Sequence, residues 1–495
     1  MSHVSQRLSF REKAGYALGD AATNFFFQAM IWYQGGFYTD VMGLSSSAAA
    51  LLFIVVRFWD AAFDPLVGTL ADRTNTRWGK FRPWVLFSAL PFGLILWLTY
   101  TTPSFGGTGR LIYAYVTYIA LMMIYSVNNT PYSALNGVMT GDSAERTSLA
   151  TFRFVAAMSA QFVVLGFTLP LVGVFGGGNA AKGWSTTFAI FGALAVVFYV
   201  IAFLSSRERI RPDPKQKTSV RQDIADVFKC RPWVVMFLVT LFVFTTLALR
   251  GTGMYYYFTY FVDKPAMLGF LRGFGLREIA ASDPNLLHVL MRWFGFSLRG
   301  DGSNVSGVGF SVFNMAGNIV TILGVLTAKP LANRFGKKAV FGVGLLLTTI
   351  VTAVIFMLPP TSAKALFVLS LLWPACYGPT IPLLWAMIAD VADFSEWKNG
   401  RRATGFVYAG IVFALKAGLG IGGALANLVT GAFGYVANVA QSAESLQGIR
   451  LTATVFSALP FAIGVVCLFF YPIGKELNLR IGDELAERRK RFANE

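Results

Sequence analysis

The sequence has little charge for its length, and this scarcity excludes an ordinary soluble domain. Only 14% of the 495 residues are Asp, Glu, Lys or Arg, whereas 55% are hydrophobic. A soluble globular chain carries about a quarter charged residues. Apolar runs long enough for membrane-spanning helices of about 20 residues recur along the chain, which is typical of a polytopic membrane protein.

Histidine and cysteine are also scarce. The sequence holds two histidines, His3 and His288, and three cysteines, Cys230, Cys376 and Cys467. Their wide spacing predicts neither a disulfide framework nor a metal site, and it argues against Ser/His/Asp chemistry. Because no catalytic dyad, triad or cofactor loop is evident either, we expect a protein that is not an enzyme and carries no cofactor.

The net charge of +17 does not indicate a nucleic-acid partner. Lys and Arg cluster in short segments between apolar runs, as the positive-inside pattern predicts for cytoplasmic loops. These segments are 71–82, 136–148, 206–232, 329–338 and 390–402, together with the tail 475–495. We therefore expect both termini in the cytoplasm.

Twelve apolar runs predict an all-α membrane protein with twelve transmembrane helices. The runs lie near 15–38, 46–70, 83–101, 109–135, 149–172, 185–205, 233–262, 306–328, 339–358, 365–389, 403–432 and 450–472. The charged segment 206–232 divides them into bundles 1–205 and 233–495. The second bundle carries a cytoplasmic tail and the extracytoplasmic insertion 263–305, which we interpret as a surface elaboration, with a short lid helix as the alternative.

The two predicted bundles show a faint internal repeat. Leu70–Arg73 follows the second span of the first half, and the similar Leu331–Arg334 follows the second span of the other half. Such repetition is typical of transporters whose substrate site lies between two related bundles. Chance similarity between two basic loops is the alternative, and the matching positions count against it.

The second predicted span carries three ionisable residues on one helical face. Arg57, Asp60 and Asp64 are spaced i, i+3 and i+7. Charged groups within a span avoid lipid and are by default functional. The alternative is a structural ion pair between helices. Two carboxylates with one arginine leave surplus negative charge, so the pattern favours a site for a cation or a proton.

Further ionisable residues lie in or beside other spans. Asp20 lies in the first span, where a carboxylate is a good acceptor for sugar hydroxyls, unless it pairs with a basic residue. The basic residues are Arg153, which alternatively snorkels to the interface, Arg250 and Lys416. Four basic residues, Arg57 included, face three acids in the spans, so uptake of a proton by one acid would leave surplus positive charge. This surplus suits an anionic substrate such as a uronide, and a neutral sugar also fits because these cations donate to hydroxyls.

Several stretches resemble the glycoside–pentoside–hexuronide:cation symporters of the major facilitator superfamily, which include the melibiose permease. The main one is Asp60–Gly68, followed by Asp72–Thr74 and Arg77–Pro83. Asp20, Asn129–Tyr132, Glu145–Arg146, Asp390–Phe394 and Lys416 extend the resemblance. It implies a major facilitator fold of two pseudo-symmetric six-helix bundles, working by alternating access in a bacterial inner membrane.

The resemblance, combined with the residue patterns, defines a candidate site. We expect Asp60, Asp64 and Ser126 to bind the coupling cation. We expect substrate contacts from Asp20, Tyr125, Asn129, Arg153, Arg250, Tyr256, Trp385 and Lys416. A charge network or gate would comprise Arg57, Asp72, Arg73, Arg77, Glu145, Arg146, Asp390 and Asp393.

The chain departs from the family pattern at three positions. Asn129 replaces a carboxylate, Ser133 replaces a tryptophan, and Phe63 replaces an asparagine beside the cation site. Hard cations need several oxygen ligands, whereas a proton needs only a suitable carboxylate. The departures therefore favour H⁺ over Na⁺ as the coupling ion, with Na⁺ still open, and count against a melibiose-like galactoside specificity.

We expect a symporter for a sugar, glycoside or sugar acid, present in the lipid bilayer as a monomer. Two alternatives stay open. One is a lipid or lysolipid transporter of the same fold, against which the polar, tyrosine-rich seventh span argues. The other is a membrane sugar sensor that transports nothing.

Overall fold

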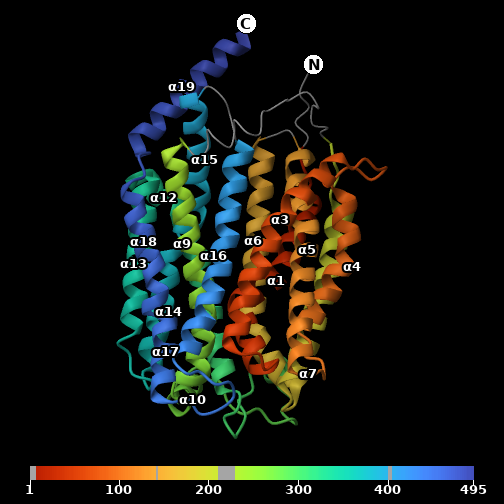
Figure 1. Ribbon diagram of the computed structural model, residues 1–495, viewed down its shortest axis with the longest axis vertical. Coiled ribbons are helices and arrows are strands. Elements are labelled where there is room, and N and C mark those ends of the chain that lie inside the picture. The colour runs from red at the N-terminus through yellow and green to blue at the C-terminus, as the bar shows by residue number, and fades with distance from the viewer. Residues whose placement is uncertain (1–6, 141–142, 210–228, 400–403, 495) are drawn as a thin grey trace. The chain divides into compact units, whose positions relative to one another are not determined.

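The computed structural model describes residues 7–140, 143–209, 229–399 and 404–494, and its regular elements there are helices (Figure 1). The first predicted span is α1 (Phe10–Trp32), continued by α2 (Gln34–Gly36) and the π-helical turn η1 (Phe37–Val41). The other helices of the first half are α3 (Ser46–Arg73), α4 (Arg82–Thr99), α5 (Gly107–Met139), α6 (Ser143–Gly176) and α7 (Ala180–Ser205).

The second half begins with α9 (Arg231–Tyr256), which runs into the π-helical turn η2 (Tyr257–Phe261). Its remaining spans are α12 (Val305–Phe335), α13 (Lys337–Ile355), α14 (Ala363–Tyr377) with α15 (Thr380–Asn399), α16 (Thr404–Ala432), and α17 (Ala443–Ala453) with α18 (Val455–Phe469). The insertion contains α10 (Lys264–Gly273) and α11 (Leu286–Trp293), and the tail forms α19 (Lys475–Asn494).

Each of the twelve predicted spans coincides with one helix or with two or three helical segments in series. Ten helical stretches of the described residues are long and apolar enough to cross a membrane, and they match the third to twelfth predicted spans. The first two spans, α1 and α3, fall outside this set. Asp20 lowers the hydropathy of α1, and the first part of α3, Ser46–Arg57, is an apolar helix.

The tenth predicted span is broken between α14 and α15 at Gly378 and Pro379. Proline has no amide hydrogen to continue the helical ladder. A Cβ at Gly378 would lie 2.8 Å from the carbonyl oxygen of Thr321 and 3.0 Å from Cα of Gly324. The absence of a side chain at Gly324 and at Gly378 therefore lets α12 approach the break closely, as small residues do between membrane helices.

The chain forms two compact units, and the first takes segments from both halves of the sequence. It comprises Met1–Pro214, Met254–Met315 and Asn427–Leu446, and the second comprises Lys215–Gly253, Ala316–Ala426 and Gln447–Glu495. The boundary predicted at 206–232 stays a prediction, and residues 210–228 lie outside the described part of the chain.

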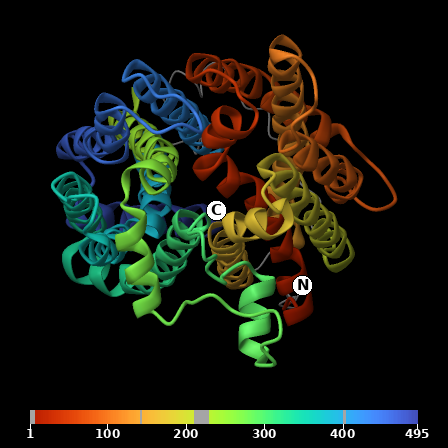
Figure 2. The same ribbon diagram turned by 90° about the horizontal axis from the view of Figure 1, so that it is seen from below.

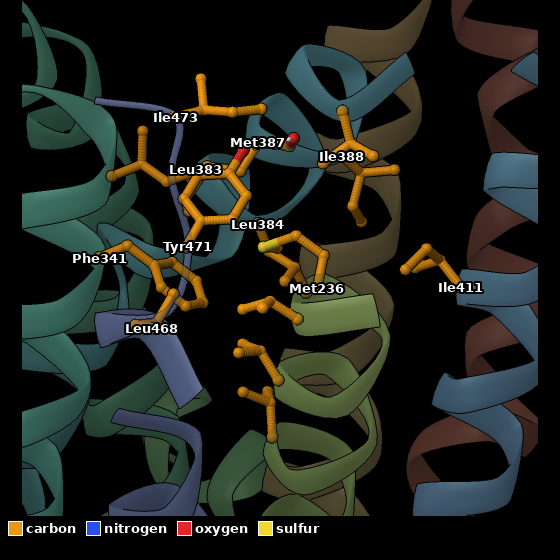
Figure 3. Close-up of a cluster of buried hydrophobic side chains, with 14 of the residues drawn as sticks. Met236, Phe341, Leu383, Leu384, Met387, Ile388, Ile411, Leu468, Tyr471 and Ile473 are labelled. Atoms are coloured by element: carbon orange, nitrogen blue, oxygen red, sulfur yellow. Dashed lines mark hydrogen bonds between the residues drawn. The ribbon is translucent and has the colours of Figure 1, made fainter. Parts of the chain in front are cut away.

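In the first unit, α1 packs against α6 and α7, and α4 packs against α7. Glycines allow the second contact, since a Cβ at Gly93 would lie 2.6 Å from the carbonyl oxygen of Gly192. In the second unit, buried apolar side chains from α9, α13, α15, α16 and α18 form one cluster (Figure 3). It includes Met236, Phe341, Met387, Ile411 and Leu468.

Candidate functional site

The carboxylate of Asp20 on α1 is held by side chains from two other helices of the first unit. Arg153 on α6 binds both oxygens, with Nε 2.5 Å from Oδ2 and Nη2 3.1 Å from Oδ1. Tyr132 on α5 donates its hydroxyl to Oδ2 at 2.8 Å. The sequence left open whether Asp20 would pair with a basic residue, and the structure pairs it with Arg153.

Two tyrosines form the frame around this pair. Tyr16 and Tyr132 stack with ring centroids 4.6 Å apart. The Tyr16 hydroxyl donates to the carbonyl oxygen of Tyr132 at 2.6 Å, and the Tyr132 hydroxyl, which donates to Asp20, also lies 2.7 Å from the carbonyl oxygen of Tyr16. A Cβ at Gly19 would lie 2.3 Å from the Tyr132 ring, so this stacking requires glycine there. The side chains of Asp20 and Arg153 keep 16% and 21% of their surface exposed. The ion pair therefore still offers acceptor and donor positions to a ligand.

Asp60 on α3 forms a second polar cluster in the same unit. It is buried, with 1% of its surface exposed, and accepts a hydrogen bond from Oγ of Ser126 on α5 at 3.0 Å. Nη1 of Arg57 lies 3.7 Å from Oδ2. Asp64, one turn further along α3, is half-buried. The structure thus places a buried carboxylate next to a hydroxyl and a guanidinium, with a second carboxylate on the adjoining turn.

Tyr125 lies beside both clusters. Its hydroxyl accepts a hydrogen bond from Nδ2 of Asn129 at 3.4 Å, and its ring packs edge-on against Phe26. The charged groups that act on the Tyr125 hydroxyl come from the two clusters and are Asp20, Arg57, Asp60 and Asp64.

Three of the predicted substrate residues belong to the second unit. Arg250 on α9 is buried, with 6% of its surface exposed, and its guanidinium carbon lies 4.5 Å from the ring centroid of Trp373. Among the described residues no carboxylate forms an ion pair with Arg250. Lys416 on α16 is half-buried, and Trp385 on α15 is exposed.

Tyr256 belongs to a further polar cluster of the first unit, which the sequence did not indicate. The Asp40 cluster consists of Thr39, Asp40, Tyr256, Tyr260, Asn427 and Tyr435. Asp40 accepts hydrogen bonds from Tyr435, from Thr39 at 2.7 Å and from Tyr260 at 3.0 Å. The Tyr256 hydroxyl lies 2.8 Å from that of Thr39.

The Asp40 cluster joins η1, η2 and the end of α16, which are segments of both halves of the sequence. The sequence carries two signals of this cluster. Asp40 lies two residues beyond the expected end of the first span, and the predicted seventh span is rich in tyrosine. Such residues are ordinary at a membrane boundary, so the pattern by itself did not single them out.

The predicted network residues lie in several separate places. In the first unit, Lys13 pairs with Glu145 at 2.9 Å, and this hydrogen bond, with one from the amide of Leu8, lowers the pKa of Glu145. In the second unit, Asp390 accepts two hydrogen bonds from Lys337, at 2.6 and 2.8 Å, and Asp393 is half-buried.

The remaining predicted network residues, apart from Arg57, are Asp72 and Arg73 at the end of α3, Arg77 in the loop after it, and Arg146 in the first turn of α6. Arg73 and Arg77 are exposed, and Arg77 lies over the ring of Trp78. The side chains of Asp72 and Arg146 are outside the described part of the structure. The sequence missed Glu208, which accepts hydrogen bonds from the amides of Lys80, Phe81 and Arg82, at 2.7 to 3.0 Å, and so caps the start of α4.

The helical arrangement is that of the major facilitator fold, and the protein is an integral membrane transporter. A crystal structure titled D-xylose-proton symporter matches it with a TM-score of 0.60 at 14% identity, covering 94% of this chain and 97% of that one. Residues 15–294 and 303–475 match the family model described as MFS/sugar transport protein. The chain belongs to this family, among its glycoside–pentoside–hexuronide:cation symporters.

Two curated relatives span nearly the whole chain. The inner membrane symporter YicJ of Escherichia coli (strain K12) is 32% identical over 98% of this chain and 97% of its own length. The glucuronide carrier protein homolog of the same organism is 29% identical over 98% of both chains.

Proposed function

We propose that this protein is a cation-coupled symporter that imports a sugar acid or a related sugar by alternating access, with both termini in the cytoplasm. The observation that carries the proposal is the buried Asp60 carboxylate beside Ser126 and Arg57. An ionised carboxylate is costly in a low-dielectric interior unless a cation neutralises it. In a transporter, the coupling ion neutralises such a carboxylate when it binds, and its binding therefore shifts the equilibrium between conformations.

Proton coupling fits this cluster better than sodium coupling. Arg57 stands 3.7 Å from Asp60, a distance that allows charge attraction but no direct hydrogen bond. A proton on Asp60 removes that attraction and releases Arg57, which links ion binding to a rearrangement of α3. Asn129, which replaces a family carboxylate, is engaged with Tyr125, and this replacement leaves one fewer anionic oxygen for sodium.

The substrate site is proposed around Asp20 and Arg153. Their paired charges offer acceptors and fixed donors to neighbouring sugar hydroxyls. Considered by itself, the second unit holds a buried cation, Arg250, for which the described residues supply no acidic partner, and an anionic group would neutralise a charge of this kind. This surplus of positive charge favours a uronate or uronide over a neutral sugar, and the name of the glucuronide carrier relative agrees with it.

The Asp40 cluster is proposed as the gate on the extracytoplasmic side. It ties η1 of the first half to η2 and Tyr435 of the second half through bonds to one carboxylate. Opening a path from that side would require these bonds to break, while loading of the central sites would favour their formation.

The proposal is tested by uptake into proteoliposomes with an imposed proton gradient, a sodium gradient or neither. The substrate panel contains uronates, glycosides and pentoses. We expect accumulation of a sugar acid driven by the proton gradient, with little driven by sodium. Absence of gradient-driven accumulation for every member of the panel would contradict the proposal, and accumulation driven by sodium alone would overturn the choice of ion.

A further inference from the structure

Helix α11 in the insertion presents its apolar side chains outward. Leu286, Leu287, Leu290 and Trp293 share one helical face by their spacing. None of the eight residues of α11 is buried, and Leu286 and Trp293 are 73% and 70% exposed. A short helix in water would normally turn such a face inward.

The polar face of α11 points the other way, toward the insertion itself. Nδ1 of His288 lies 2.7 Å from Oδ2 of Asp283. Nη1 of Arg292 donates to the carbonyl oxygen of Ala280 at 2.8 Å, and Asn285 caps the start of the helix by accepting from the amide of Leu287. The helix is therefore held in place through its polar side, which leaves the apolar side available.

The chain after α11 is fixed to the last turns of α6. Phe294 and Phe296 pack on Phe167, with ring centroids 5.1 and 5.7 Å apart. A Cβ at Gly295, which has φ of 82°, would lie 2.4 Å from the carbonyl oxygen of Pro170. Nη2 of Arg299 donates to the carbonyl oxygen of Gly173 at 2.6 Å. Figure 2, which views this end of the structure, shows the insertion in green.

The end of α6 is the end of a membrane span. The span Ser148–Gly176 ends three residues after Gly173. Because the chain directly after α11 contacts Phe167, Pro170 and Gly173, α11 lies near the level where this span ends, with its apolar face exposed.

We infer that α11 is an interfacial helix whose apolar face enters the boundary between headgroups and acyl chains of the extracytoplasmic leaflet. Amphipathic helices bind membranes in this way, and tryptophan favours this depth. The partner is the bilayer itself, and neither a second protein nor a lid over the transport route is needed to cover the face. This assignment does not depend on the proposed substrate or coupling ion.

The test places single nitroxide labels at positions 286–293 in a variant lacking the native cysteines Cys230, Cys376 and Cys467, reconstituted into phosphatidylethanolamine–phosphatidylglycerol vesicles. Accessibility to oxygen reports lipid, and accessibility to a water-soluble nickel chelate reports water. Val174, exposed on α6, serves as the lipid reference, and Asp301 serves as the water reference.

We expect oxygen accessibility to exceed nickel accessibility at Leu286, Leu290 and Trp293, with the reverse at His288 and Arg292. Higher nickel accessibility at the apolar positions would overturn the inference, and so would protection from both reagents. A label-free check compares quenching by brominated lipid between the native protein and Trp293→Phe. Loss of a quenched component in the variant supports the inference, and identical quenching contradicts it.

Discussion

Arg153 binds Asp20 through two different nitrogens, which fixes both planar groups relative to each other. The guanidinium also lies over the Tyr132 ring, with its central carbon 5.1 Å from the ring centroid. A fork that donates two parallel hydrogen bonds is a property of arginine and cannot be reproduced by lysine. The pair is therefore a geometric element as well as an electrostatic one.

Arg153→Lys should weaken substrate binding by about 10-fold or more, since a hydrogen bond to a charged group contributes about 1.5–3 kcal/mol. The measurement is the substrate concentration that gives half-maximal uptake. Arg480→Lys is the matched control, because Arg480 pairs with Glu484 on the tail helix α19. Equal behaviour of the two variants would mean that the fork has no part in substrate binding.

Gly19→Ala should destabilise the protein by about 1–3 kcal/mol, the usual range for overpacking a core. The added methyl group would meet the Tyr132 ring and disturb the stack that supports Asp20. The measurement is the midpoint of thermal unfolding in detergent. Gly68→Ala is the control, because a Cβ there has no atom of the described residues within 4 Å, and a midpoint drop as large in this control would show that packing on Tyr132 is not the cause.

Acid should loosen the contact between the start of α1 and the start of α6. The pKa of Glu145 is lowered by the hydrogen bond from Lys13, so the stabilising effect is complete above the unfolded-state pKa of about 4.3 and is lost as the pH falls through the lower folded-state pKa. The measurement is amide hydrogen exchange at residues 8–13. The ratio of protection between the native protein and Glu145→Gln should approach one as the pH falls below the folded-state pKa of Glu145, and a ratio that does not change with pH would refute the pairing.

Tyr435→Phe should loosen the Asp40 cluster and increase amide exchange in η1 and η2 by about 10-fold or more, again from a charged hydrogen bond of about 1.5–3 kcal/mol. Tyr113→Phe also removes a tyrosine hydroxyl, but that hydroxyl donates to the backbone of Leu98 outside the cluster. Exchange in η1 and η2 should not change in this control. If both variants leave these turns equally protected, the cluster does not act as a gate.

The sequence predicted the helices well because span length and hydropathy are local properties. It also singled out Asp60 and Asp64, since charges within a span are conspicuous whatever they contact. The partner of Asp20 was not predictable by spacing, because Arg153 lies 133 residues away and reaches it through the packing of α1 on α6.

The interactions of residues at the ends of the spans could not be predicted from the sequence. Asp40 and Tyr435 are polar residues at membrane boundaries, where charge and tyrosine are common, and only the fold shows that they share a hydrogen bond. Glu208 was missed for a similar reason, because its role depends on three backbone amides of a distant loop.

The most direct test compares counterflow with accumulation for Asp60→Asn in proteoliposomes. Counterflow of labelled substrate needs only alternating access, whereas accumulation against a gradient also needs the coupling ion. The account predicts that the variant retains counterflow and loses accumulation, while Asp301→Asn retains both. Accumulation by Asp60→Asn at the native level under a proton gradient would contradict it.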